Sequence, residues 1–84
     1  MATYSMQEVS ELTEVAPWNI KYWSDMNYLG KVKRLKIGNI KHRRFTELHV
    51  MLIKKINDYL AQGHTLGASV ERAKGDMGIE LDKD

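Results

Sequence analysis

The chain has 84 residues, with 13 Lys and Arg against 11 Asp and Glu, which gives a net charge of +2. A chain of this length forms one domain with a modest core, because it buries only somewhat over ~60% of the surface that its unfolded form exposes. It contains no cysteine, which excludes disulfide bonds and thiolate metal ligands. It also lacks a long apolar run and the basic and apolar regions of a signal peptide, so we expect a cytoplasmic protein without a membrane partner.

The first predicted element is a short helix from about Met6 to Thr13. Ser5 and Glu8 have the spacing of a capping box, in which each side chain bonds the backbone N–H of the other residue. Val9 and Leu12 follow at helical spacing. These signals together predict that a helix begins directly after Ser5.

A second helix is expected after a turn at residues 13–15, with Pro17 at its first position, where the missing N–H of proline costs nothing. Ala16 is a poor N-cap, because its side chain accepts no hydrogen bond. Asn27 suits the left-handed conformation that ends a helix. The helical period places Ile20 and Trp23 on the inner face and Trp18, Lys21, Tyr22 and Asp25 on the outer face. Since Trp23 fills the inner position, we expect Trp18 to be exposed.

Residues 31–45 change to a period of two and contain β-branched residues, which predicts a β-hairpin. Gly38 and Asn39 suit a two-residue turn of type II′. This turn would pair Lys36 with Lys41 and Arg34 with Arg43. Like charges directly opposite one another destabilise a sheet, so the pairing is easier to understand if a polyanion lies against the hairpin.

The same region carries the densest positive charge of the chain. No acidic residue lies between Asp25 and Glu47. Within that gap are seven of the thirteen Lys and Arg, namely Lys31, Lys33, Arg34, Lys36, Lys41, Arg43 and Arg44. Such clustering is typical of a phosphate-binding surface, because each neutralised phosphate releases condensed counterions.

Two further helices complete the predicted domain. Thr46 would cap a third helix that ends at Ala61, and Thr65 a fourth that ends at about Lys74. The predicted core-facing stripe of the third helix contains Leu48, Met51, Leu52, Ile56, Tyr59 and Leu60, widened by Val50 and Ile53. Residues 75–84 contain two glycines and four acids, which predicts a domain of residues 1–74 followed by a flexible acidic tail.

The order helix, tight turn, helix, basic hairpin and long helix is that of a winged helix-turn-helix, a mainly α fold of about four helices with a two-stranded wing. Several short pieces occur together at set spacings, namely Tyr4-Ser5, Val15-Ala16-Pro17, Ile20-Lys21-Tyr22-Trp23, Leu29, His42-Arg43-Arg44-Phe45 and Gly63-His64-Thr65-Leu66. Through these pieces residues 4–66 resemble the DNA-binding domain of the MerR family of regulators. The chain differs from that family at four positions, with Glu14 for a usual Gly, Ala16 for a Ser cap, Trp18 for a frequent Arg and Lys21 for the usual Arg.

The resemblance implies a transcription regulator that binds double-stranded DNA in a sequence-specific way, with its second helix in the major groove and its wing on phosphates. Trp18, Asn19 and Lys21 would lie at or near bases, and Tyr22 on a phosphate. Arg43 and Arg44 would lie on the wing side, where the cluster of positive charge adds Lys33, Arg34, Lys36 and Lys41.

Two other functions stay open. The chain has the small size of an excisionase or another architectural DNA-binding factor of a mobile element. A winged helix with a basic wing also suits contact with an acidic protein partner. Footprinting on neighbouring intergenic DNA would separate these functions from a regulator, because they differ in the number and arrangement of the sites bound.

Enzyme chemistry has little support, since the sequence contains no Gly-rich phosphate loop, nucleophile elbow or convergent set of His and carboxylates, and we expect a protein that is not an enzyme. We therefore expect no cofactor. His42, His49 and His64 lack metal-ligand spacing and are expected to be non-ligands. No heptad segment follows Lys74, so we expect a monomer or weak dimer when free, associated with the nucleoid, with dimeric or cooperative binding on DNA left open.

Overall fold

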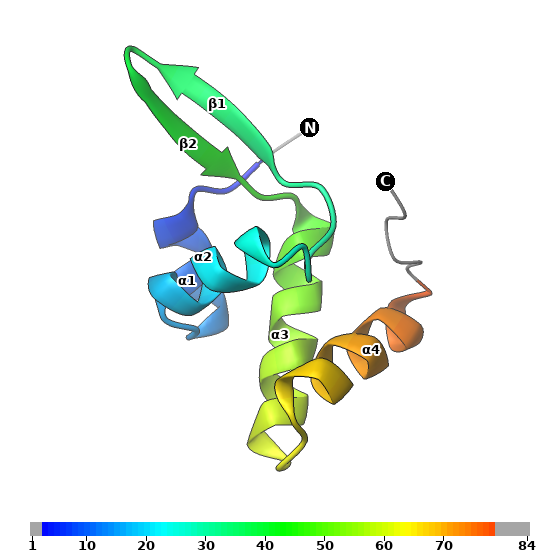
Figure 1. Cartoon of the computed structure of the whole chain (residues 1–84). Helices are drawn as coiled ribbons and strands as arrows, with labels where there is room; N and C mark the ends of the chain where they lie inside the picture. The colour runs from blue at the N-terminus through cyan, green and yellow to red at the C-terminus, as the bar shows by residue number, and fades with distance from the viewer. Residues whose placement is uncertain (1–2, 79–84) are drawn as a thin grey trace.

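The computed structural model describes residues 3–78, which form four helices and a two-stranded antiparallel sheet. In chain order the elements are α1 (Met6–Thr13), α2 (Pro17–Asp25), β1 (Lys33–Ile37), β2 (Ile40–Arg44), α3 (Glu47–Ala61) and α4 (Leu66–Met77). Figure 1 shows the hairpin of β1 and β2, which we call the wing, projecting from the helices. α1 and α2 lie on one side of α3, and α4 lies on the other. The predicted winged helix-turn-helix is confirmed.

The start and the end of α1 follow from its capping residues. The backbone N–H of Glu8 donates to Ser5 Oγ over 3.2 Å, and the N–H of Ser5 donates to Glu8 Oε1 over 2.8 Å, which is the predicted capping box. The helix ends at Thr13, and Glu14 follows in the left-handed conformation with a φ of 60°. This sharp reversal leads the chain directly into α2.

α2 begins at Pro17, as predicted, and Ala16 makes no side-chain cap hydrogen bond. Asn27 follows the helix in the predicted left-handed conformation, with a φ of 62°. The buried core contains Val9, Val15, Ile20, Trp23, Leu29, Phe45, Val50, Leu52, Ile53, Ile56, Val70 and Ala73. Because this core takes residues from all four helices and from the base of the wing, it fixes α2 within the domain.

The wing has the predicted register and turn. Its strands pair Lys36 with Lys41 and Arg34 with Arg43. Gly38 has a φ of 62° and Asn39 is not left-handed, which fits a type II′ turn and not a type I′ turn. At the base of the wing, Tyr4 and Phe45 exchange two backbone hydrogen bonds of 2.7 and 2.9 Å. Buried Phe45 and these bonds attach the wing to the helices.

α3 begins and ends where predicted, but the prediction of its core-facing stripe is partly wrong. Thr46 caps the helix, because its side chain accepts from the backbone N–H of His49. Leu48 and Met51, placed in the predicted stripe, are about half exposed, whereas Val50 and Ile53 are buried. The reason is that α1 and α4 pack on opposite sides of α3, with α4 along its C-terminal half (Figure 1). Neither α1 nor α4 covers the side of the first turns of α3 on which Leu48 and Met51 lie.

α4 extends to Met77, beyond the predicted end at about Lys74. The last turn is held on α3, where Tyr59 donates a hydrogen bond to Asp76 and Lys55 Nζ lies 3.9 Å from the same carboxylate. These contacts stabilise residues 75–77 as the last turn of α4, although the sequence analysis predicted that they belong to the tail. From residue 79 onward the predicted tail lies outside the described residues, so the domain boundary stays a prediction.

Candidate nucleic-acid interface

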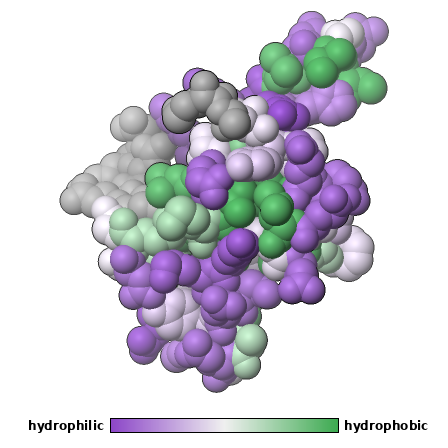
Figure 2. Space-filling view, turned by 180° about the vertical axis from the view of Figure 1, so that it is seen from behind, coloured by the Kyte–Doolittle hydropathy of each residue, from purple (hydrophilic) through white to green (hydrophobic). Residues whose placement is uncertain are grey.

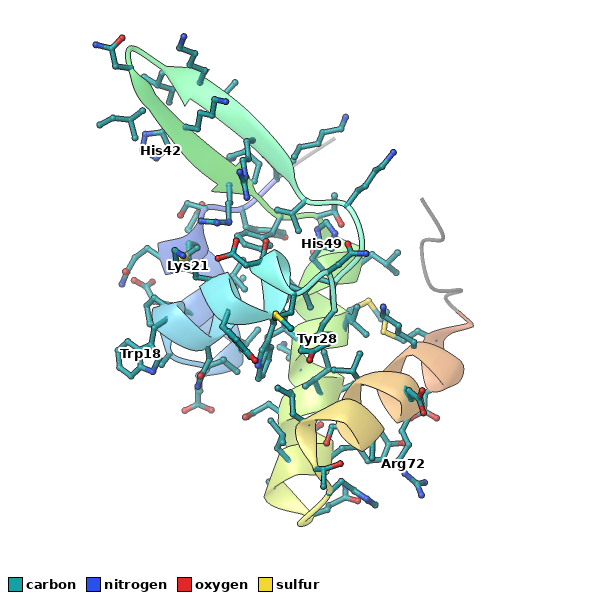
Figure 3. All side chains as sticks on the ribbon, in the orientation of Figure 1. Trp18, Lys21, Tyr28, His42, His49 and Arg72 are labelled. Atoms are coloured by element: carbon teal, nitrogen blue, oxygen red, sulfur yellow. The ribbon has the colours of Figure 1, made fainter. Side chains whose placement is uncertain are left out.

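The outer face of α2 is exposed to solvent because the inner face of the helix is buried in the core. Ile20 and Trp23 have exposed fractions of 0% and 3%, which fixes the rotation of the helix about its axis. Trp18 is 73% exposed, as predicted, and points away from the other helices in Figure 3. Asn19 is exposed beside it, and neither side chain makes a hydrogen bond within residues 3–78. Both side chains are therefore available to a partner.

The other two predicted residues of α2 already have partners within the chain. The ring of Tyr22 packs edge-on against that of Tyr28, with their centroids 6.5 Å apart. Lys21 is exposed, but its Nζ donates to Asp25 Oδ2 over 2.9 Å, one helical turn further on. A DNA contact by Lys21 would therefore have to share or replace this ion pair.

The wing has two chemically different faces, because side chains alternate along each strand and the register aligns them across the pair. One face, which we call the basic face, contains Arg34, Lys36, Lys41 and Arg43. The opposite face, which we call the apolar face, contains Leu35, Ile37, Ile40 and His42. Leu35, Ile37 and Ile40 are 51%, 59% and 62% exposed, and Figure 2 shows apolar side chains gathered on the wing as seen from behind.

Two predicted cations, Lys33 and Arg44, do not belong to the basic face. They pair with each other at the base of the wing, on the side of the apolar face. Arg44 donates from Nε to Thr3 Oγ1 and from Nη2 to the carbonyl oxygen of Thr3, each over 3.1 Å. The run of basic residues in the sequence is thus divided between two faces. The period of two was a signal for this division.

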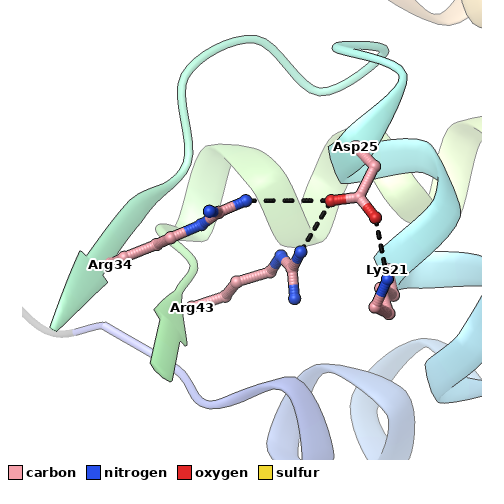
Figure 4. A network of polar contacts seen from close by, with 4 residues as sticks. All are labelled: Lys21, Asp25, Arg34 and Arg43. Atoms are coloured by element: carbon pink, nitrogen blue, oxygen red, sulfur yellow. Dashed lines mark hydrogen bonds and ion pairs between the residues drawn. The ribbon is translucent and has the colours of Figure 1, made fainter. Parts of the chain in front are cut away.

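Asp25, in the last turn of α2, joins α2 to the basic face (Figure 4). Its Oδ1 accepts a hydrogen bond of 2.6 Å from Arg43 Nη2 and lies 3.7 Å from Arg34 Nη2. Its Oδ2 accepts the bond from Lys21 described above. The hydrogen bonds from Lys21 and Arg43 lower the pKa of the Asp25 carboxyl, so this residue carries its negative charge at neutral pH.

The helical period predicted Asp25 on the outer face of α2, but no contact or function was predicted for it. The spacing of four residues from Lys21 was a signal for that ion pair. The contact with Arg43 crosses 18 residues of chain and depends on how the base of the wing lies beside the end of α2. It leaves the Arg43 side chain only 18% exposed, with a buried Nε that has no hydrogen-bond partner among residues 3–78. A phosphate contact by Arg43 stays a prediction.

The three histidines lie in separate places, with separate partners. His42 is exposed on the wing, and the ring of His64 packs edge-on against Tyr59 with centroids 5.4 Å apart. His49 Nδ1 accepts the backbone N–H of Thr46 over 3.0 Å at the start of α3. Within residues 3–78, no group of three or more His, Asp and Glu is placed to hold a metal ion. None of the helices in this range is long and apolar enough to cross a membrane.

Comparison with known proteins agrees with this architecture. A search of curated proteins found no match. The family model for a MerR HTH family regulatory protein matches residues 4–74, which include the helix-turn-helix, the wing, α3 and most of α4. Proteins of this family are DNA-binding regulators of transcription. The chain belongs to the MerR helix-turn-helix family of regulatory proteins.

Proposed function

We propose that this protein regulates transcription by binding one specific sequence of double-stranded DNA, with α2 in the major groove and the basic face of the wing on the adjacent phosphates. The observation that supports this proposal most directly is the ion-pair cluster at Asp25. Lys21 of α2 and Arg43 of the wing both contact this carboxylate, over 2.9 and 2.6 Å. The outer face of α2 and the basic face of the wing therefore adjoin, and one duplex can contact both.

The start of α2 is best suited to read bases. Asn19 is exposed, and an Asn side chain can form two hydrogen bonds to the edge of adenine in the major groove. Trp18 offers a large exposed apolar surface beside it, which suits contact with a thymine methyl group. We assign sequence discrimination to these two residues, and a position at the edge of the groove to Lys21 and Tyr22.

The outer part of the wing is best suited to bind phosphates. Lys36 and Lys41 are exposed and lie directly opposite one another near the turn. Their mutual repulsion destabilises the free hairpin, and a phosphate between them would relieve it. Such contacts carry no sequence information, but each one makes affinity depend more steeply on salt.

The test begins with selection of a binding site from a pool of random duplexes. Affinities of Asn19→Ala and Lys41→Ala for the selected and for a random duplex are then measured at several salt concentrations. We expect Asn19→Ala to lower the ratio of specific to random affinity by roughly 5- to 150-fold, the value of one bidentate base contact, with the salt slope unchanged. We expect Lys41→Ala to weaken both duplexes by similar factors and to reduce the salt slope by about one unit.

Lys54→Ala is the matched control for charge, because Lys54 is exposed on α3 and does not belong to the wing or to the cluster at Asp25. It should leave the salt slope close to that of the unaltered protein. An equal loss of slope in Lys54→Ala and Lys41→Ala would contradict a role for the wing. Footprinting of the selected site in genomic DNA would show whether one site or a tandem array is bound, and an array would favour the architectural function.

The apolar face of the wing favours contact with another protein as a second candidate function. Leu35, Ile37 and Ile40 lie on the side of the wing opposite the ion pairs to Asp25, and all three are more than half exposed. If selection enriched no DNA sequence, and a protein partner were lost on Ile37→Ser but kept on Lys41→Ala, this candidate would replace the first.

A further inference from the structure

Asp25 is an acidic residue in the middle of a surface that we assign to a polyanion. Phosphates near it are repelled, because like charges placed at an interface oppose binding. The same carboxylate interacts with Lys21, Arg34 and Arg43, at 2.9, 3.7 and 2.6 Å. Three cations around one anion still leave the surface positive. Electrostatic attraction to DNA therefore does not explain why an acidic residue stands at this position, and its contacts with both α2 and the wing point to another role.

The basic face of the wing has few other contacts with the helices. All residues of β1 are exposed, so burial does not fix the orientation of this strand. Within the described residues, the side-chain hydrogen bonds and ion pairs that link the basic face to α2 are those of Arg34 and Arg43, and both end on Asp25. Lys36 and Lys41 lie further out on the same face. Buried Phe45 and its bonds to Tyr4 anchor the base of the wing, and on the basic face the angle between the wing and α2 depends on this one carboxylate.

The same contacts compete with DNA phosphates. Lys21 and Arg43 donate to Asp25 in the free protein and must share or leave it before they bind a phosphate. Ion pairs between exposed side chains are weak and are screened by salt. Lys21 and Arg34 are 59% and 51% exposed, so a phosphate held in the right position can replace their pairs with Asp25, whereas Arg43, at 18%, is less accessible. On an unrelated sequence α2 makes no specific contacts with the bases, so the phosphates are not held in position. They therefore replace the ion pairs to Asp25 less readily.

We propose that Asp25 is a positioning residue that raises the sequence specificity of DNA binding, because it holds the wing at a fixed angle to α2 and keeps Lys21, Arg34 and Arg43 from binding phosphates of unrelated sequences. This proposal rests on the proposed function. It assigns to a negative charge the task of weakening non-specific binding, whereas the wing lysines strengthen binding to any sequence.

The test compares Asp25→Asn with Glu71→Gln, which removes the same charge from an exposed position on α4. Both variants are measured on the selected and the random duplex over a range of salt. For Asp25→Asn we expect tighter binding to random DNA, a salt slope steeper by about one to two units, and a specific-to-random ratio lower by roughly two- to fivefold, the factor expected for an exposed ion pair. Glu71→Gln should change the slope and the ratio much less. Asp25→Glu keeps the charge and should restore most of the original slope.

A second measurement does not require DNA. NMR relaxation of backbone amides in the free protein should show larger fast motions in residues 33–44 of Asp25→Asn than of Glu71→Gln, with α3 unchanged in both. If the unaltered protein bound no DNA but this change in the wing appeared, the proposed function would fail while the positioning of the wing by Asp25 stood. If DNA bound, but Asp25→Asn matched Glu71→Gln in salt slope, affinity ratio and wing motion, the role of Asp25 would be refuted and the proposed function would stand.

Discussion

α2 and the wing, the two halves of the proposed interface, are attached to the domain by different forces. α2 is held by the burial of Ile20 and Trp23, and burial of a large apolar side chain contributes about 1.5–3 kcal/mol. The wing is held by Phe45 at its base and, along its basic face, by ion pairs to Asp25. Ion pairs between exposed side chains are weak and are screened by salt, and of the two wing arginines Arg43, at 18% exposed, is better shielded from water than Arg34, at 51%. The position of α2 is therefore set by burial in the core, whereas the angle of the wing depends in addition on polar contacts along its basic face.

The largest expected effect is on stability, and it separates the two halves. Ile20→Ala should lower the free energy of unfolding by about 2–5 kcal/mol, because it leaves a cavity in the core beneath α2. Leu35→Ala, on the exposed apolar face of the wing, should change it by less than about 1 kcal/mol. Urea unfolding followed by circular dichroism measures both. Similar losses for the two variants would show that the wing is part of the cooperative core.

A smaller effect is expected at the turn that precedes α2. Glu14 has a left-handed φ of 60°, a conformation that costs a residue other than Gly about 1–2 kcal/mol. Glu14→Gly should therefore raise the free energy of unfolding by roughly 1 kcal/mol. Glu11→Gly, within α1, is the matched control and should lower it by about as much, because Gly is unfavourable inside a helix. A loss of stability in Glu14→Gly would mean that the Glu14 side chain contributes contacts that outweigh the backbone cost.

The fold was predictable where local chemistry decides it, and the site only in part. The capping box at Ser5, Pro17 at the start of α2 and the Gly38 turn are determined by residues close together in sequence. Failures arose where distant elements meet. Leu48 and Met51 are exposed because of where α1 and α4 pack on α3, and α4 continues past Lys74 because Tyr59 and Lys55 hold its last turn.

The same limit applies to the candidate site. Exposure of Trp18 followed from the helical period, and the pairing of Arg34 with Arg43 followed from the turn. The contact between Asp25 and Arg43 did not follow from either, because it joins elements separated by the loop between α2 and β1. The density of charge in the sequence thus predicted where cations gather but did not show that Lys21 and Arg43 are already paired with Asp25.

The smallest predicted effect concerns pH and the attachment of the wing to α3. His49 caps α3, and burial lowers its pKa, partly offset by a hydrogen bond to the backbone of Lys31 just before β1. The folded protein therefore favours neutral His49, and its contribution to stability is present above the ordinary pKa of about 6.5 and is lost as the pH falls below it. Thermal unfolding at pH 7 and at about pH 5.5 should show a smaller loss in His49→Gln than in the unaltered protein. His42→Gln, on the exposed wing, should leave the loss unchanged, and an equal reduction in both variants would contradict this account.

The central claim, that α2 and the wing lie on the same duplex, can be tested by DNA cleavage from single attachment points. The chain has no cysteine, so Trp18→Cys on α2, Asn39→Cys at the wing turn and Glu71→Cys on α4 each provide one site for an iron chelate. On the selected duplex, we predict cleavage within the bound sequence from position 18, cleavage of its flank from position 39, and none above background from position 71. Cleavage from position 71 as strong as from the other two, or no cleavage from positions 18 and 39 when binding is complete, would contradict the account.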